Sequence, residues 1–128
     1  MSCGNQNLIS EQEQLPGELP ITIYQAATFN LTLTYLDGNG NPVDLTDYTG
    51  DMIIANGSTT VLELSTSNGR MILGGTAGTV QLLVDASDTA ALTPASNLQY
   101  DLLLTSQGGT VIPLVAGAAY IRASVTGA

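Results

Sequence analysis

Apolar and polar side chains alternate in several short segments of this chain. In residues 28–35, every second residue is apolar and the residues between them are polar. Because a β-strand points successive side chains to opposite faces, this pattern predicts a strand with one buried face. Segments 78–84 and 98–105 show a similar alternation. The residues expected to face the core are Phe29, Leu31, Leu33, Tyr35, Val80, Leu82, Val84, Leu98, Tyr100, Leu102 and Leu104.

Turn-forming residues separate these segments. Residues 37–42 read Asp-Gly-Asn-Gly-Asn-Pro, a run that favours a chain reversal. The pair Asn56-Gly57 is a favoured hairpin turn and is expected to join strands at 52–55 and 60–64. Turns recurring about every 8–12 residues are typical of an antiparallel sandwich.

Two further segments complete the expected elements. Residues 87–92 form the one helix candidate, with Ser87 as its N-cap. The last strand region covers 111–115 and 119–125, with a break expected near Pro113 or Gly117. The fold class predicted is therefore all-β: an antiparallel β-sandwich, immunoglobulin-like or jelly-roll-like, with one short helical turn.

The first twenty residues differ from the rest and predict an extended N-terminal arm, 1–20, ahead of a sandwich domain at 21–128. The segment is polar, and Pro16 and Pro20 interrupt any regular element that would run through it. A disordered tail is the alternative. If the segment is an arm, its apolar residues are the ones expected to dock on a partner: Leu8, Ile9, Leu15 and Leu19.

The charge balance excludes two classes of partner. The chain has 11 acidic residues against Arg70 and Arg122, giving a formal net charge of -9. Binding to nucleic acid or to anionic membranes requires clustered basic side chains, which are missing here. Charged residues make up only 10% of the chain, so neutral polar residues must cover much of its surface. Such a surface is easier to cover with a protein partner, and copies packed in an oligomer or a multi-copy assembly are expected.

The residues available for catalysis are few. The chain contains no histidine and no lysine, and its single cysteine, Cys3, lies in the predicted arm. The commonest general bases and covalent nucleophiles are thereby removed. Asp44 and Asp47 are the remaining carboxylate pair, in a turn-rich segment where surface acids are usual. The chain is therefore predicted not to be an enzyme and to carry no cofactor.

One segment resembles the start of a calcium-binding loop. Asp37, Asn39 and Asn41 alternate as the first oxygen ligands of such a loop do. The sixth position is Pro42 instead of glycine, and the twelfth is Tyr48 instead of glutamate. A plain hairpin turn is the favoured interpretation, with weak calcium binding as the alternative.

Two blocks of the sequence resemble a known family. The first is FNLTLTY at 29–35 followed by DGNGNPVDLTDYT at 37–49, and the second runs from 78–80 through 87–92 to 100–102. Both look like segments of small tailed-phage structural proteins, similar to the N-terminal β-sandwich domain of upper-baseplate (BppU-like) proteins. The resemblance implies an attachment domain without catalytic residues. The longer polar arm, and the absence of a receptor-binding domain after the sandwich, favour an adaptor or decoration role.

The expected function is accordingly a non-enzymatic virion protein, made in the host bacterial cytoplasm. It would dock to tail, neck or capsid proteins through its arm and its sheet edges. A capsid decoration (cement) protein is one alternative. A carbohydrate- or surface-binding module is another, although it would need exposed aromatic side chains gathered on one face, and the chain has no tryptophan.

Overall fold

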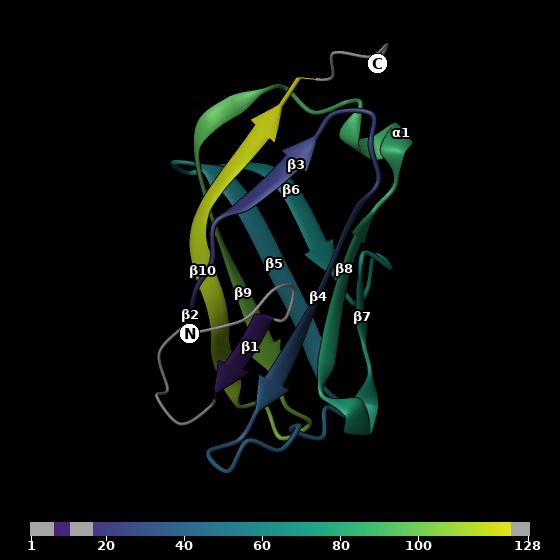
Figure 1. Ribbon diagram of the computed structural model, residues 1–128, viewed down its shortest axis with the longest axis vertical. Coiled ribbons are helices and arrows are strands. Elements are labelled where there is room, and N and C mark those ends of the chain that lie inside the picture. The colour runs from purple at the N-terminus through teal and green to yellow at the C-terminus, as the bar shows by residue number, and fades with distance from the viewer. Residues whose placement is uncertain (1–6, 11–16, 124–128) are drawn as a thin grey trace.

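Two facing β-sheets form the molecule (Figure 1). The computed structural model describes residues 7–10 and 17–123. One sheet has four strands in the order β1-β4-β8-β7, and the other has six, in the order β2-β10-β9-β5-β6 with β3 also on β10. The strands are β1 Asn7–Ser10, β2 Gly17–Glu18, β3 Ile21–Tyr24, β4 Phe29–Leu36, β5 Thr49–Asn56, β6 Thr59–Ser65, β7 Met71–Leu73, β8 Thr79–Val84, β9 Ala95–Thr105 and β10 Val111–Arg122.

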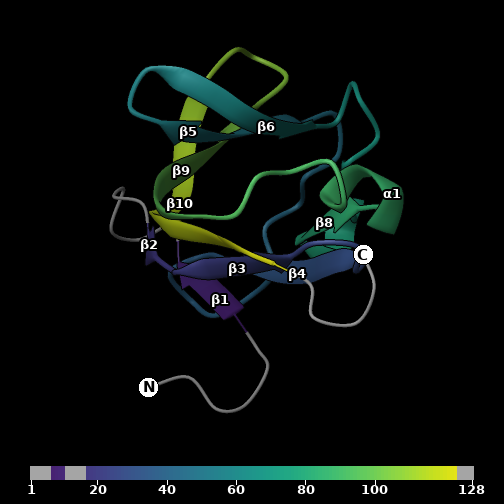
Figure 2. The same cartoon turned by 90° about the horizontal axis from the view of Figure 1, so that it is seen from above.

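The strand order is that of an immunoglobulin variable-type sandwich. Strands β4, β8 and β7 correspond to one sheet of that fold, and β10, β9, β5 and β6 to the other. Figure 2 shows the layers edge on, with β5, β6 and β9 in one layer and β4 and β8 in the other. The predicted fold class is confirmed, and the topology selects its immunoglobulin-like form. No helix in the described ranges has the length and apolar character needed to cross a membrane.

The core lies between the sheets and is built by the alternating segments. Nine of the eleven side chains expected to face inward are at most 5% exposed: Leu33, Tyr35, Val80, Leu82, Val84, Leu98, Tyr100, Leu102 and Leu104. The other two, Phe29 and Leu31, are only half-buried. The inward prediction therefore fails in part at the start of β4, where the sandwich opens.

The predicted hairpin between β5 and β6 is present, with a shifted turn. Asn56 pairs with Thr59, so the two loop residues are Gly57 and Ser58 instead of Asn56 and Gly57. Gly57 has φ +63°, a conformation that glycine adopts without the steric cost of a Cβ. The last strand also differs from the prediction. β10 is continuous and absorbs Pro113 at an irregularity in its pairing with β9 between Pro113 and Val115.

The helical turn begins earlier than predicted. Helix α1 spans Ala86–Thr89, with Asp85 as its N-cap residue instead of Ser87. Inside it, the buried Thr89 hydroxyl donates to the Ala27 carbonyl at 2.8 Å and lies 3.1 Å from the Ala86 carbonyl. This contact ties the turn to the loop between β3 and β4.

The predicted arm contributes two short strands to the two sheets. β1 pairs in parallel with the second half of β4, from Asn7 opposite Leu33 to Ser10 opposite Leu36. β2 pairs in parallel with β10, with Gly17 opposite Val115. The N-terminal region therefore runs along an edge of each sheet in turn.

Candidate functional site

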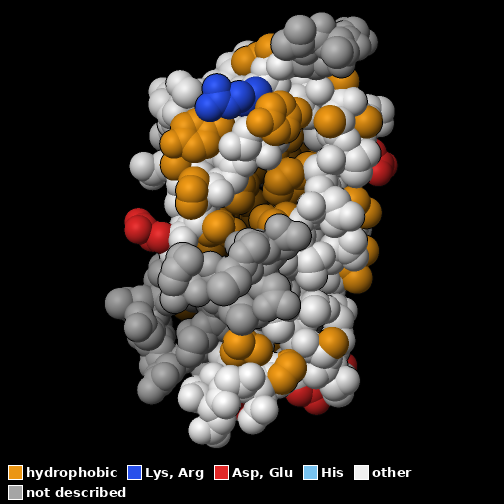
Figure 3. Space-filling model, viewed as in Figure 1, with side chains coloured by type: hydrophobic (Ala, Val, Ile, Leu, Met, Phe, Trp, Pro, Cys, Tyr) orange, Lys and Arg blue, Asp and Glu red, His pale blue; other side chains and the backbone are white. Residues whose placement is uncertain are grey.

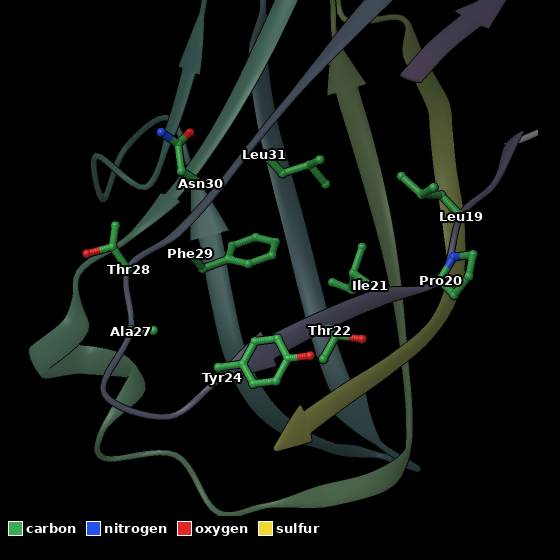
Figure 4. Close-up of a pocket in the computed structure, with 10 residues that line it drawn as sticks. All are labelled: Leu19, Pro20, Ile21, Thr22, Tyr24, Ala27, Thr28, Phe29, Asn30 and Leu31. Carbon is green, nitrogen blue, oxygen red and sulfur yellow. The ribbon is translucent and has the colours of Figure 1, made fainter. Parts of the chain in front are cut away.

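An open groove lies between β3 and β4, on one side of the sandwich. Its cavity is about 390 Å³ in volume. Figure 4 shows Phe29 and Leu31 on the β4 wall, with Ile21 of β3 pointing toward them. The lining residues are Leu19, Pro20, Ile21, Thr22, Tyr24, Ala27, Thr28, Phe29, Asn30 and Leu31. In Figure 3 the same side of the molecule is a hollow floored by hydrophobic atoms.

Two strand edges face this groove. β4 is bonded to β8 on its inner side from Phe29 to Thr34, and β1 covers its outer side only from Leu33 to Leu36. Within the described part of the chain, no strand lies on the outer side of β4 along residues 29–32. Among the strands that the structure describes, β3 pairs with β10 alone, so its groove side is open as well. Among the described residues, the groove is thus bordered on two sides by strand edges without a pairing partner.

The groove is uncharged in a strongly acidic protein. Residues 21–36, which make up β3, the connecting loop and β4, contain no Asp, Glu, Lys or Arg. At the far end of β3, Arg122 pairs with Tyr24, and its guanidinium carbon lies 5.8 Å from the centre of the Tyr120 ring. Tyr24 itself is 56% exposed. A protein segment can therefore approach this face without meeting the repulsion that the acidic surface imposes on acidic partners.

The backbone at Leu19 forms the lower wall of the groove, and a hydrogen bond from the core holds it in place. The Tyr100 hydroxyl donates to the Leu19 carbonyl at 2.6 Å, and the Leu19 amide donates to the Ala116 carbonyl at 3.0 Å. Gly117 makes this approach feasible, because a Cβ there would lie 2.7 Å from the Leu19 oxygen. Burial raises the pKa of Tyr100 to about 12. The wall thus depends on a neutral, buried phenol.

Removing that phenol is expected to change the alkaline stability. Since the folded pKa of Tyr100 lies above its ordinary value of about 10, its contribution is present below pH 10 and is lost as the pH rises toward 12. At pH 7, Tyr100→Phe should lower the free energy of unfolding by about 1 kcal/mol through the lost hydrogen bond. Urea unfolding at pH 7 and pH 11 should show this deficit shrinking at the higher pH. An equal deficit at pH 7 and pH 11 would contradict the role of a neutral, hydrogen-bonded Tyr100. A similar pH-dependent effect of the control Tyr24→Phe would contradict it as well.

The predicted docking residues fall in different places. Leu8 and Ile9 belong to β1, where their backbones pair with Thr34 and Tyr35. Leu15 lies outside the described residues. Leu19 is half-buried against the core and lines the groove. That these residues bind a partner stays a prediction.

The groove residues themselves were not predicted as a site. Phe29 and Leu31 carry the alternation of a strand with one buried face, and the sequence alone assigned both to the core. Residues 19–36 carry no charged side chain, but residues 102–121 carry none either, so the distribution of charge in the sequence did not single out the groove.

The calcium-like segment forms a turn stabilised by its own aspartate. One carboxylate oxygen of Asp37 accepts hydrogen bonds from the backbone amides of Asn39, at 2.8 Å, and Asn41, at 3.0 Å. The segment ends in a bridge between Leu36 and Pro42. The favoured hairpin interpretation therefore accounts for this geometry. Among the described residues, no three His, Cys, Asp or Glu side chains are grouped to hold a metal ion.

The remaining carboxylates of interest lie on the surface. Asp44 accepts from the Thr46 hydroxyl at 2.6 Å and from its amide at 3.0 Å, and these bonds hold the Asp44 pKa below its ordinary value. On the outer face of the six-stranded sheet, a hydrogen bond to Asp51 and then the charge of Asp51 raise the pKa of Glu63.

The Glu63–Asp51 pair gives a testable pH dependence. A raised folded pKa means that this carboxyl stabilises the fold at low pH and loses that contribution as it ionises. Glutamine stays neutral at every pH. The melting temperature of Glu63→Gln, compared with that of the wild type, should therefore be slightly higher at pH 7 than the same comparison gives at pH 4. Thermal unfolding at both values measures the difference, with the exposed Glu18→Gln as control. A larger gain in melting temperature at pH 4 than at pH 7 would show that the pKa of Glu63 is not raised in the folded protein.

The fold and the groove together define an immunoglobulin-like β-sandwich with one open side. No protein-family model and no curated protein matches the sequence. Among solved structures, the chain is similar to the N-terminal domain of phage TP901-1 ORF48, with 13% identity and a TM-score of 0.52 over 91% of this chain and 94% of that one. This likeness establishes a shared fold.

Two further structural matches have TM-scores below 0.5. One is Drosophila OTK, extracellular domains 3-5, with 17% identity and a TM-score of 0.34, covering 82% of this chain and 33% of that one. The other is a chain from the complex of ICOS with ICOS-L and an anti ICOS-L VNAR domain, with 13% identity and a TM-score of 0.42 over 84% of this chain and 55% of that one.

Proposed function

We propose that this protein is a non-enzymatic structural component of a tailed-phage particle. In this role it docks to tail, neck or capsid proteins through its N-terminal arm and sheet edges. The observation that carries the proposal is the end-to-end structural likeness to a phage protein domain, which covers 91% of this chain and 94% of that one. The sequence resemblance to upper-baseplate N-terminal domains points the same way.

The geometry supports an attachment role over a catalytic one. The groove combines uncharged side chains with open strand edges. Open edges bind other chains through main-chain hydrogen bonds, which do not require particular side chains. The groove lining contains no acid, base or thiol that could act on a substrate.

A carbohydrate-binding role has less support from the surface. Stacking on a sugar requires flat aromatic faces presented together. Among the described aromatic side chains, Tyr24 is the one that is more than half exposed. Binding on a glycan array that is lost with Tyr24→Ala would favour this alternative.

The experiment that tests the docking proposal is deletion of residues 1–18 in the phage or prophage that encodes the protein. The deletion removes β1 and β2 and keeps Leu19 in place. The truncated chain should remain folded by circular dichroism and be missing from purified particles. A chain with residues 1–18 in scrambled order, which preserves length and charge, is the matched control and should be missing as well. Normal incorporation of the truncated chain would refute docking through the arm.

A further inference from the structure

Asparagine followed directly by glycine occurs at three places in the chain: Asn39-Gly40, Asn56-Gly57 and Asn68-Gly69. Asparagine is a thermolabile residue, and a following glycine favours its spontaneous deamidation because no side chain hinders the attacking nitrogen. The backbone nitrogen of the glycine attacks the side-chain carbonyl carbon of the asparagine, a C–N bond forms, the amide proton is lost and ammonia leaves. Water then opens the five-membered succinimide ring at either carbonyl and gives aspartate or isoaspartate. Since the dipeptide is the same at all three places, the fold decides which of them reacts.

The side chain of Asn68 is held away from this reaction by three hydrogen bonds. Its Oδ1 accepts from the backbone amides of Ser65 and Arg70, each at 3.0 Å, and its Nδ2 donates to the Glu63 carbonyl at 2.9 Å. The carboxamide must break these bonds before its carbonyl carbon can meet the Gly69 nitrogen. Deamidation at Asn68 is therefore slowed by the native turn.

At Asn39 the attacking nitrogen is engaged instead. The Gly40 amide donates to the Asp37 carbonyl at 3.0 Å, and the Asn39 amide donates to the Asp37 carboxylate at 2.8 Å. The Gly40 nitrogen has to give up its hydrogen bond before it can lose its proton and attack. This pair is slowed as well, although by one bond instead of three.

Asn56 has neither form of protection. It is exposed at the end of β5, where it pairs with Thr59, and Gly57 is the first residue of the turn that leads into β6 (Figure 1). Within the described part of the chain, neither the Asn56 carboxamide nor the Gly57 amide makes a hydrogen bond. A Cβ at Gly57 would meet no atom within 4 Å, and Gly57 also lines an open hollow of about 460 Å³. Water can therefore reach the succinimide from the side of the turn.

We propose that Asn56 is a site of spontaneous covalent modification in the folded protein, with water as the co-reactant. Both products replace a neutral carboxamide with a carboxylate, which adds one negative charge to a chain of formal net charge -9. The isoaspartate product also inserts a methylene into the main chain beside the Asn56–Thr59 pair. That pair closes the hairpin at the β6 end of the six-stranded sheet. The inference concerns the isolated chain, so its failure would leave the proposed virion role untouched.

The test is to age the full chain in mildly alkaline buffer below its melting temperature and to follow all three sites by peptide mass spectrometry. Asn56 should be converted at least about tenfold faster than Asn68 and at least about fivefold faster than Asn39, as the hydrogen bonds lost at each site imply. In guanidinium chloride the three rates should converge, because the unfolded chain removes the structural protection. Conversion of Asn39 or Asn68 as fast as Asn56 in the folded protein would overturn the proposal. So would an unchanged Asn56 while the unfolded chain is converted at all three sites.

Gly57→Asp is the matched variant at the site itself. Aspartate tolerates the positive φ of +63° at this position, so the hairpin should be kept, as circular dichroism can verify. Its side chain hinders the attack on Asn56, which should react at least about tenfold more slowly in both the folded and the unfolded variant. The rates at Asn39 and Asn68 should stay as they are in the wild type. An undiminished rate at Asn56 in this variant would show that the glycine nitrogen does not carry the reaction.

Discussion

Replacing Leu102 with alanine should cost about 3 to 4 kcal/mol of the free energy of unfolding. Leu102 is fully buried in the middle of β9, where its backbone pairs with Met52 on one side and Val115 on the other. The surrounding strands are bonded on both sides and cannot collapse into the space left behind. With a typical urea dependence of about 1.5 kcal/mol per M, the unfolding midpoint should fall by about 2 M.

The next residue along the strand supplies the matched control. Leu103 lies on the opposite face of the sheet and is only half-buried, so Leu103→Ala removes the same atoms from a less packed environment. It should cost less than about 1.5 kcal/mol. Equal losses for Leu102→Ala and Leu103→Ala would contradict the placement of the core between the two sheets.

Replacing Gly117 with alanine should cost about 2 to 3 kcal/mol. The added Cβ would lie 2.7 Å from the Leu19 oxygen and 3.1 Å from the Leu19 carbonyl carbon, so the backbone beside β10 must move away. That movement strains or breaks the hydrogen bonds of Leu19 with Ala116 and Tyr100, each of which contributes about 1 kcal/mol. Urea unfolding measures the loss.

Gly108→Ala is the control for this substitution. A Cβ at Gly108 would meet only the Ser106 hydroxyl oxygen, at 4.0 Å, so the change should be within about 0.5 kcal/mol of neutral. Because the lower wall of the groove depends on Leu19, Gly117→Ala combined with Tyr100→Phe should cost less than the sum of the two single effects. Full additivity would indicate that the two residues do not hold the same segment.

The sequence predicted the strands well because alternation reports directly which face of a strand is buried. Val80, Leu82 and Val84 show this in β8, where all three are at most 1% exposed. Alternation cannot report whether a second strand lies beside the edge. Phe29 and Leu31 therefore looked like core residues, and only the long-range arrangement of β3 and β4 makes them groove residues.

The arm shows a second limit of sequence reasoning. β1 and β2 join the sheets through backbone pairing, which leaves little trace in the side-chain pattern of a polar segment. The details of turns were also hard to place. Pro113 suggested a break, yet the irregularity beside it lets β10 continue, and Asp85 instead of Ser87 occupies the N-cap position of α1.

The measurement that tests the central proposal most directly is the copy number of this protein per particle, by quantitative mass spectrometry of purified virions. A structural component should be present at a fixed number of copies, a handful to a few dozen for a tail, neck or fibre-adaptor position. Hundreds of copies would instead select the capsid decoration form of the same proposal. Complete absence from particles of a phage that expresses the protein would contradict the virion role.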